Sequence, residues 1–248
     1  MGVQTNDRMV LKISGADAKR FLQDLVTNNL DQGGLIYAAL LTPQGKYLFD
    51  FFILKQNDTW LIDVKSDCAA ALAQRLTMYR LRADVVIEDS GLSVQRGVGD
   101  LPDGAVTDPR HPALGWRLYT LGISDEPTVD WDAIRVEHCI PETGIELIAD
   151  NTYILEAGFE RLNGIDFKKG CYVGQEINAR MKHKTELRKG LVTVAVDGHA
   201  NVGTQILSGG KPVGTLFTQS GGKAIAYLRF DRAKGDMAAG DATVRLIS

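Results

Sequence analysis

The order of strand-like and helix-like segments in the first half of the sequence is the feature that most restricts its fold. Residues 9–13 alternate between apolar and polar side chains, which predicts a strand. Ser14 then opens a predicted helix, with Asp17 three residues later in the position of a capping box. The apolar face of that helix consists of Phe21, Leu22, Leu25 and Val26.

The segments that follow are mostly strands. Residues 35–41 and 46–54 predict a hairpin across Thr42-Pro43-Gln44-Gly45, because Pro and Gly suit a tight turn. The next three segments are predicted as a strand, a helix and a strand: residues 60–64, 67–82 and 84–88. Since strands and helices do not alternate regularly, the pattern favours an α+β fold over a doubly wound sheet.

The chain changes character toward its C-terminus. Residues 97–115 are rich in Gly, Pro and Asp and predict a loop, before a strand at 116–121 and a helix at 129–138. From Arg188 onward, β-rich runs alternate with Gly-Gly and Asp-Gly pairs: 191–196, 204–207, 213–218, 223–228 and 243–247. Such runs are typical of a small antiparallel barrel or sandwich. We therefore expect an α+β region over residues 1–185 and a C-terminal antiparallel β-barrel over residues 186–248.

Composition excludes several classes of protein. Of the 248 residues 44% are hydrophobic and 24% charged, which is ordinary for a globular protein. The net charge of −3 gives no whole-protein reason to expect nucleic-acid binding. The sequence has no apolar run of the roughly 18 residues that a membrane helix needs and no signal-peptide pattern. We expect a cytoplasmic protein without a membrane partner.

The cysteines and histidines limit the metal chemistry. Three cysteines, Cys68, Cys139 and Cys171, without C-x-x-C spacing argue for a reducing compartment and against a disulfide framework. An iron–sulfur cluster usually needs four thiolates, and the four histidines are not in ligand spacing either. We predict no metal site within this chain alone, although a cluster could be shared across an interface with a partner.

The run Lys169-Gly170-Cys171-Tyr172-Val173-Gly174-Gln175-Glu176 is the strongest local signal for chemistry. It places one thiol between two glycines, with Arg180 shortly after it. Glycine allows a tight turn or close approach to a ligand, and neighbouring cations favour the reactive thiolate. The alternative is a small buried residue in a turn. Cys68 and Cys139 lack such neighbours and are expected in the core.

This run lies in a basic stretch of an acidic chain. Residues 161–190 contain eight Lys or Arg and only three Asp or Glu. A solvated helix face would explain this excess, and so would a site for a carboxylate or phosphate. Nucleic acid fits this stretch less well, because few aromatic side chains are interleaved for base stacking.

The octapeptide resembles the signature of the YgfZ-type proteins, which are folate-binding relatives of the glycine-cleavage T protein (aminomethyltransferase) linked to iron–sulfur cluster assembly and repair. The resemblance continues through residues 14–18 and 21–28, through 41–46 to Asp50, and through 135–137 and 140–141. It implies a T-protein-like fold around a folate site, with tetrahydrofolate or a one-carbon derivative as cofactor. The implied protein partners are iron–sulfur scaffold, carrier or client proteins.

The resemblance also implies roles for individual residues. Glu137 matches the T protein's pterin-binding carboxylate, and Asp50 matches its essential aspartate near the reactive nitrogens of folate. An Asp within an apolar strand needs a partner or a cavity, whereas Glu137 could also be an ordinary surface residue. Phe49 stands where the T protein has a second Asp, which argues against aminomethyl transfer. The expected working residues are Cys171 and Asp50, and the expected cofactor-binding residues are Asp50, Glu137, Lys168, Lys169, Tyr172, Gln175, Glu176 and Arg180.

Three functional classes fit these observations. The first is a folate-binding accessory factor for iron–sulfur enzymes, with the Cys171 thiol favoured as thiolate by Lys169 and Arg180. The second is a folate-dependent aminomethyltransferase or methyltransferase. The third is a cysteine-nucleophile enzyme with His138 or His183 as base, which requires a Cys–His hydrogen bond. The octapeptide favours the first class and leaves open whether the protein turns over a substrate.

Overall fold

The computed structural model describes the chain except residues 1, 5–6, 123–128, 185–186 and 248. It divides into two compact units, residues 1–129 with 160–176 and residues 130–159 with 177–248. The chain therefore leaves the first unit, enters the second, and returns before leaving again. The boundary predicted between residues 185 and 186 lies outside the described residues.

A five-stranded antiparallel sheet forms the centre of the first unit, in the order β3-β4-β5-β2-β6. Its strands are β2 (Arg8–Ser14), β3 (Leu35–Leu41), β4 (Tyr47–Gln56), β5 (Thr59–Lys65) and β6 (Val86–Asp89). The predicted hairpin is confirmed, since β3 and β4 pair across the turn at residues 42–45.

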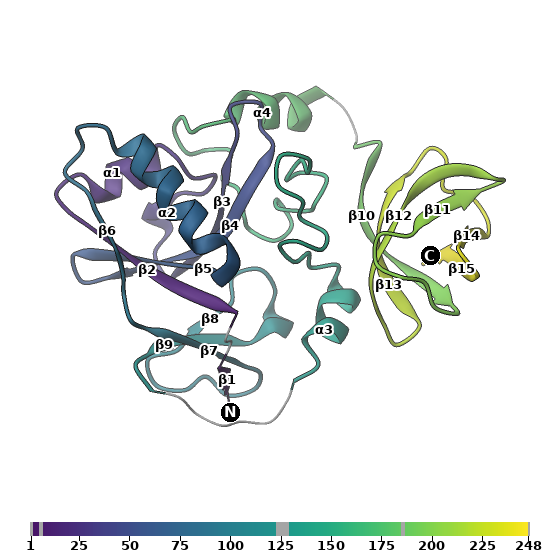
Figure 1. Ribbon diagram of the computed structural model, residues 1–248, viewed down its shortest axis with the longest axis horizontal. Helices are drawn as coiled ribbons and strands as arrows, with labels where there is room; N and C mark the ends of the chain where they lie inside the picture. Colours follow the sequence, from purple (N-terminus) through teal and green to yellow (C-terminus); the bar gives the residue numbers. More distant parts are fainter. Residues whose placement is uncertain (1, 5–6, 123–128, 185–186, 248) are drawn as a thin grey trace. The chain divides into compact units, whose positions relative to one another are not determined.

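Two helices cover one face of this sheet, α1 (Ala18–Gln23) and α2 (Ser66–Arg80) (Figure 1). Their apolar side chains share one core with the sheet, in which Leu22 and Leu72 are fully buried. The start predicted for α1 was wrong, because Ser14 ends β2 instead of capping the helix. The Asp17 carboxylate accepts a hydrogen bond from the backbone N–H of Asp84 at 2.8 Å.

A second, smaller sheet completes the first unit in the order β1-β7-β9-β8. Its strands are β1 (Gly2–Gln4), β7 (Ser93–Gly97), β8 (Val106–Thr107) and β9 (Trp116–Thr120). The predicted loop over residues 97–115 therefore contains a short strand, and it also contains the 3-10 helix η2 (Pro112–Leu114). A further 3-10 helix, η1 (Leu30–Gln32), follows α1.

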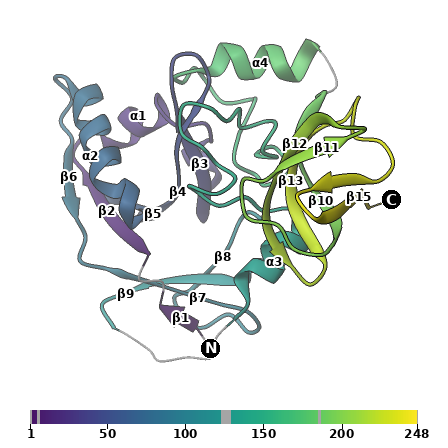
Figure 2. The same cartoon turned by 45° about the vertical axis from the view of Figure 1, so that its right-hand side comes forward.

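The second unit contains α3 (Trp131–His138) and a closed six-stranded barrel (Figure 2). The barrel strands are β10 (Lys189–Asp197), β11 (Gln205–Ser208), β12 (Lys211–Ser220), β13 (Lys223–Arg229), β14 (Met237–Ala239) and β15 (Ala242–Leu246). The predicted barrel is confirmed, although β14 has no clear sequence signal. Helix α4 (Gln175–Lys184) begins in the first unit and continues into the second.

Helix α3 is fixed to the barrel by buried polar contacts. Arg135 donates to Glu146 Oε2 at 3.1 Å and to Thr218 Oγ1 at 2.9 Å. The same glutamate accepts from the Thr218 hydroxyl at 2.5 Å, so all three buried polar side chains are paired. No described helix has the length and apolar character of a membrane span.

Candidate functional site

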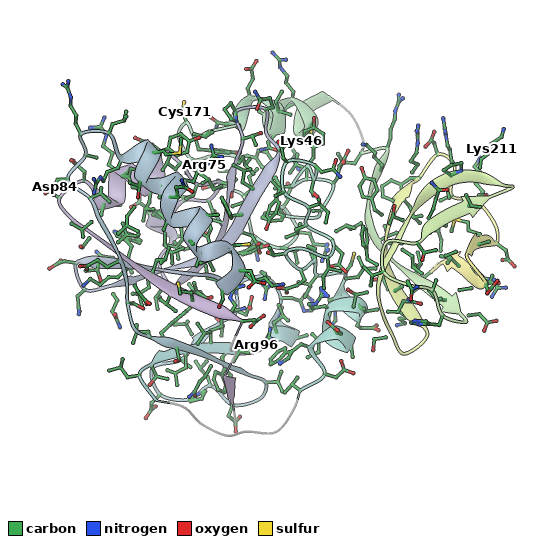
Figure 3. All side chains as sticks on the ribbon, viewed as in Figure 1. Lys46, Arg75, Asp84, Arg96, Cys171 and Lys211 are labelled. Atoms are coloured by element: carbon green, nitrogen blue, oxygen red, sulfur yellow. The ribbon has the colours of Figure 1, made fainter. Side chains whose placement is uncertain are left out.

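Cys171 lies on an exposed loop that leads into α4. Its side chain is the exposed one of the three free thiols, whereas Cys68 and Cys139 are half-buried. Figure 3 labels Cys171, whose sulfur points outward from the ribbon. The expected exposure is confirmed, and the expected burial of the other two cysteines holds only in part. Among the described residues Cys171 makes no hydrogen bond, so the Cys–His pair of a nucleophilic enzyme is not observed there.

The two glycines beside Cys171 have different structural roles. Gly174 has φ +81°, and a Cβ on it would lie 2.6 Å from the carbonyl oxygen of Thr42 and 3.0 Å from Cα of Gly45. A side chain there would collide with the turn between β3 and β4. A Cβ on Gly170 would meet nothing within 4 Å, and its φ is not positive. The fold therefore requires Gly174, while space beside Gly170 stays open next to the thiol.

Lys169 anchors this loop to the end of α1. Its Nζ donates to the carbonyl oxygens of Gln23 at 2.6 Å, Val26 at 2.5 Å and Asn28 at 3.1 Å. Burial lowers the pKa of Lys169 to about 8, against the raising effect of the carboxylates of Asp24 and Asp166. Because three carbonyls occupy the three ammonium donors, Lys169 has no donor left for a bound anion in this arrangement.

Thr27 and Asn28 hold the segment that precedes the loop. The Thr27 hydroxyl donates to the carbonyl of Gly164 at 2.7 Å, and the Thr27 carbonyl accepts from Asp166 N–H at 3.1 Å. The Asn28 amide donates to the carbonyl of Asn163 at 2.6 Å. Thr27 and Asn28 are almost fully buried. Sequence reasoning assigned these two residues no role, because the segment they bind is more than 130 residues away in the chain.

The remaining residues of the run are partly structural. Tyr172 is buried with its ring centroid 5.2 Å from Lys169 Nζ, and its carbonyl accepts from Gln175 N–H at 3.2 Å. Lys168 and Glu176 are exposed. Arg180 is also exposed and lies on the part of α4 that belongs to the second unit. Folate contacts by these residues stay a prediction.

Asp50 is held by two tyrosines in the first unit. It lies on β4 with 6% exposure and accepts from Tyr37 Oη at 2.9 Å and from Tyr47 Oη at 2.8 Å. Burial, reinforced by the Asp50 charge, raises the pKa of Tyr37 well above its usual value, so this phenol stays a donor. The partner that we expected for a buried aspartate is therefore a pair of phenols.

A β-bulge brings Tyr47 and Asp50 to the same face. Leu40 pairs with Phe49, but Leu41 pairs with Tyr47, so β4 has one extra residue at this point. Residues three apart on a regular strand point to opposite faces, and one extra residue reverses that parity. Strict alternation could not have predicted this pairing.

A buried charge network lies on the same sheet face. Arg8 and Arg117 bind Asp63 at 2.6 and 2.7 Å, and Arg117 also binds Asp108 at 3.1 Å. Arg110 donates to both oxygens of Asp108 at 3.1 and 2.9 Å. Although burial raises the pKa of Asp108, the charges of Arg110 and Arg117 lower it to about 2.

Phe52 connects this network to the aspartate site. Its ring centroid lies 3.8 Å from the guanidinium carbon of Arg117 and 4.8 Å from that of Arg110. The guanidinium of Arg110 also lies 5.4 Å from the ring of Tyr37, which binds Asp50. The phenol that holds Asp50 thus packs against a fixed cation.

Glu137 lies on α3 in the second unit and is exposed. Its Oε2 accepts from Lys223 Nζ of β13 at 2.6 Å, and this hydrogen bond and charge lower the pKa of Glu137. An exposed ion pair of this kind is weak and can be exchanged for another partner. Asp50 and Glu137 belong to different units.

Asn178 on α4 is a further candidate for a functional residue. It is 0% exposed, and neither its amide nitrogen nor its oxygen has a hydrogen-bond partner among the described residues. Buried polar groups are normally paired, so an unpaired amide calls for a functional or structural explanation. Across the described part of the chain, no group of three or more His, Cys, Asp or Glu could hold a metal ion.

The fold as a whole resembles that of a solved structure. The whole chain matches the crystal structure of the glycine cleavage system aminomethyltransferase T from Bartonella henselae, with a TM-score of 0.78 and 12% identity over 84% of that chain. The protein thus has the T-protein fold that the sequence predicted. Residues 188–248 match the family model of the CAF17 C-terminal beta-barrel domain.

Sequence comparison points to particular relatives within that fold class. The chain is 31% identical to the mitochondrial iron-sulfur cluster assembly factor IBA57 homolog of Neurospora crassa, over 73% of this chain and 50% of that protein. It is 28% identical to the mitochondrial iron-sulfur cluster assembly factor IBA57 of Mus musculus, over 93% of this chain and 78% of that protein. The chain spans about half the length of the fungal relatives. The prediction of a cytoplasmic location is wrong on this comparison, because these relatives are named as mitochondrial proteins.

Proposed function

We propose that this chain is an accessory factor for the assembly or repair of iron–sulfur clusters that works through the Cys171 thiol and binds tetrahydrofolate or a one-carbon derivative of it. The observation that carries the proposal is the placement of Cys171. Its thiol is exposed, while Lys169 and Gly174 fix the loop on either side. The likeness to proteins named iron–sulfur cluster assembly factors supports the same role.

A single exposed thiolate can complete the coordination of a cluster whose other ligands come from elsewhere. Within this chain the described residues supply no three-residue metal group, so the other ligands would come from a scaffold, carrier or client protein. Open space beside Gly170 gives such a partner room to approach the sulfur. Cys171 would then be one ligand of a cluster whose remaining ligands belong to the partner protein.

The folate part of the proposal is supported by the acceptor chemistry of two carboxylates. Reduced pterins carry adjacent N–H donors, and ionised carboxylates are strong acceptors for them. Asp50 is fixed by two phenols, and Glu137 is held only by an exposed lysine. Each carboxylate, within its own unit, is thus a candidate acceptor for pterin N–H groups, and bound folate would supply or accept the one-carbon unit.

The role of Cys171 can be tested in a strain that lacks the endogenous protein. We expect Cys171→Ala to abolish rescue of iron–sulfur enzyme activity, because the variant has lost its exposed thiol. Cys68→Ala is the matched control and should rescue. Circular dichroism and thermal melting should show both variants folded. Full rescue by a folded Cys171→Ala protein would remove the proposed role of the thiol.

Folate binding can be tested separately by calorimetry with tetrahydrofolate. Glu137→Ala and Asp50→Asn should each weaken binding by about 1.5–3 kcal/mol, the usual contribution of a hydrogen bond to a charged group. Lys55→Gln, an exposed change at the end of β4, should leave the affinity unchanged. The folate proposal fails if the folded wild-type protein shows no heat of binding at millimolar ligand.

The alternative is a catalytic aminomethyltransferase, which the T-protein fold alone would permit. Phe49 occupies the position of that enzyme's second aspartate, so we expect no ammonia release when the protein is mixed with the other glycine-cleavage components. Sustained ammonia release under those conditions would favour the enzyme over the accessory factor.

A further inference from the structure

A basic groove lies on the outside of the barrel in the second unit. It has a volume of about 610 Å³. Arg188, Lys189, Arg229 and Arg232 line it together with Tyr227. Arg188 and Lys189 end the basic stretch of residues 161–190, whereas Tyr227, Arg229 and Arg232 lie more than 50 residues beyond Cys171.

The groove places two like charges directly opposite each other on neighbouring strands. Lys189 on β10 and Arg229 on β13 are direct cross-strand partners, so their side chains leave the same face of the sheet. Like charges opposite each other repel and destabilise a strand pair. Neutral residues at either position would remove this repulsion.

Two carboxylates offset only part of this positive charge. Glu156 accepts from the Tyr227 hydroxyl at 2.6 Å and lies 3.6 Å from Lys189 Nζ. Asp231 lies 3.8 Å from Arg229 and 3.7 Å from Arg232, at the long end of ion-pair distances. Four cations therefore face two carboxylates, and Arg188 forms no ion pair with any described residue.

The shape and walls of the groove indicate an extended anion. The cations come from the start of β10, the end of β13 and the turn after it, and the groove of about 610 Å³ has room for several anionic groups. Pro212 is exposed and adds apolar wall, and it has no N–H to offer. Tyr227 is the one aromatic in the lining, which is too few for stacking a nucleic-acid strand.

We propose that this groove binds a carboxylate-rich segment of a partner protein, with Glu or Asp side chains on the four cations and apolar side chains against Tyr227 and Pro212. Such recognition is favoured by charge complementarity and weakened by salt. The inference depends on neither the folate site nor the Cys171 thiol, so it stands or falls separately from the proposed function.

Fluorescence anisotropy with the full chain tests this proposal. The probe is a labelled ten-residue peptide of alternating Glu and Val, with pyrophosphate and a single-stranded oligonucleotide as separate ligands. We expect Arg188→Gln/Arg229→Gln to weaken peptide binding by about tenfold or more, equivalent to losing one strong charge-assisted contact. Lys234→Gln/Arg245→Gln removes the same charge from elsewhere on the barrel and should change the affinity by less than about twofold.

The groove variant should melt at or above the wild-type temperature, since it relieves the opposition of Lys189 and Arg229. If it does not fold, Arg232→Gln, which lies in a turn outside the strands, provides the same comparison. Equal weakening in both double variants, or no peptide binding at low salt, would overturn the proposal. Preference for pyrophosphate or the oligonucleotide through the same residues would overturn its choice of ligand.

Discussion

At the scale of single residues, the two glycines around Cys171 are the most informative contrast. They look equivalent in the sequence, but a Cβ would be unhindered at Gly170 and would strike backbone atoms at Gly174. Gly174 therefore keeps the loop against the turn between β3 and β4. Gly170 makes no such close approach, and its lack of a side chain leaves space open beside Cys171.

This contrast gives a prediction for a matched pair of variants. Gly174→Ala should reduce the free energy of unfolding by about 1–3 kcal/mol, because it combines a positive φ with a steric clash. Gly170→Ala should be neutral or stabilise by about 0.4–1 kcal/mol, since alanine reduces the freedom of the unfolded chain. Urea denaturation measures both, and equal losses would contradict the assignment.

At the scale of elements, the short helix α1 depends on a residue from far along the chain. Lys169 donates to carbonyls at the end of that helix and in the turn that follows it. A six-residue helix is too short to be stable alone, so this contact helps to define where α1 ends. It also ties the position of the Cys171 loop to the end of that helix.

The lowered pKa of Lys169 predicts a pH dependence of stability. Its pKa falls from the usual 10.5 to about 8 on folding, so the unfolded chain binds more protons between these values. The cost of burying the ammonium is full below about pH 8 and disappears as the pH rises toward 10.5. We expect the stability of the wild type relative to Lys169→Met to increase from pH 7.5 to 9.5 in urea titrations. A constant difference would mean that the three carbonyls compensate the burial of the charge.

Some of these elements could be predicted from local sequence signals, and others could not. The β3–β4 hairpin and α2 were predictable because turn residues and apolar patterns are local signals. The start of α1 was not, because Ser14 is the last residue of β2 and Asp17 binds the N–H of Asp84, a residue distant in sequence. The pairing of Tyr47 with Asp50 required a bulge, and the partners of Lys169 required tertiary structure, so neither had a local signal.

At the scale of the whole molecule, the first unit is built around a sheet with two different faces. One face packs apolar side chains against α1 and α2, and the other carries the network of Asp63, Asp108 and three arginines. Continuous apolar stretches predict burial but not which distant arginine meets which aspartate. The fold class was therefore predictable, while the network that supports Asp50 was not.

This network predicts how acid affects the protein. The pKa of Asp108 is lowered from 3.8 to about 2, so its contribution to stability is complete above pH 3.8 and is lost as the pH falls through about 2. The stability difference between the wild type and Asp108→Asn should therefore shrink between pH 5 and pH 2 in urea titrations. A difference independent of pH would show that the carboxylate charge does not stabilise the fold.

The division of the chain into interleaved units has a consequence for its synthesis. The first unit needs residues 160–176, which leave the ribosome only after residues 130–159 of the second unit have already emerged. N-terminal domains usually fold as units while translation continues. Here the nascent first unit must wait for its last segment, which also carries Cys171, before it can close. A premature stop codon anywhere between residues 130 and 160 would therefore leave both units incomplete, not one finished and one missing.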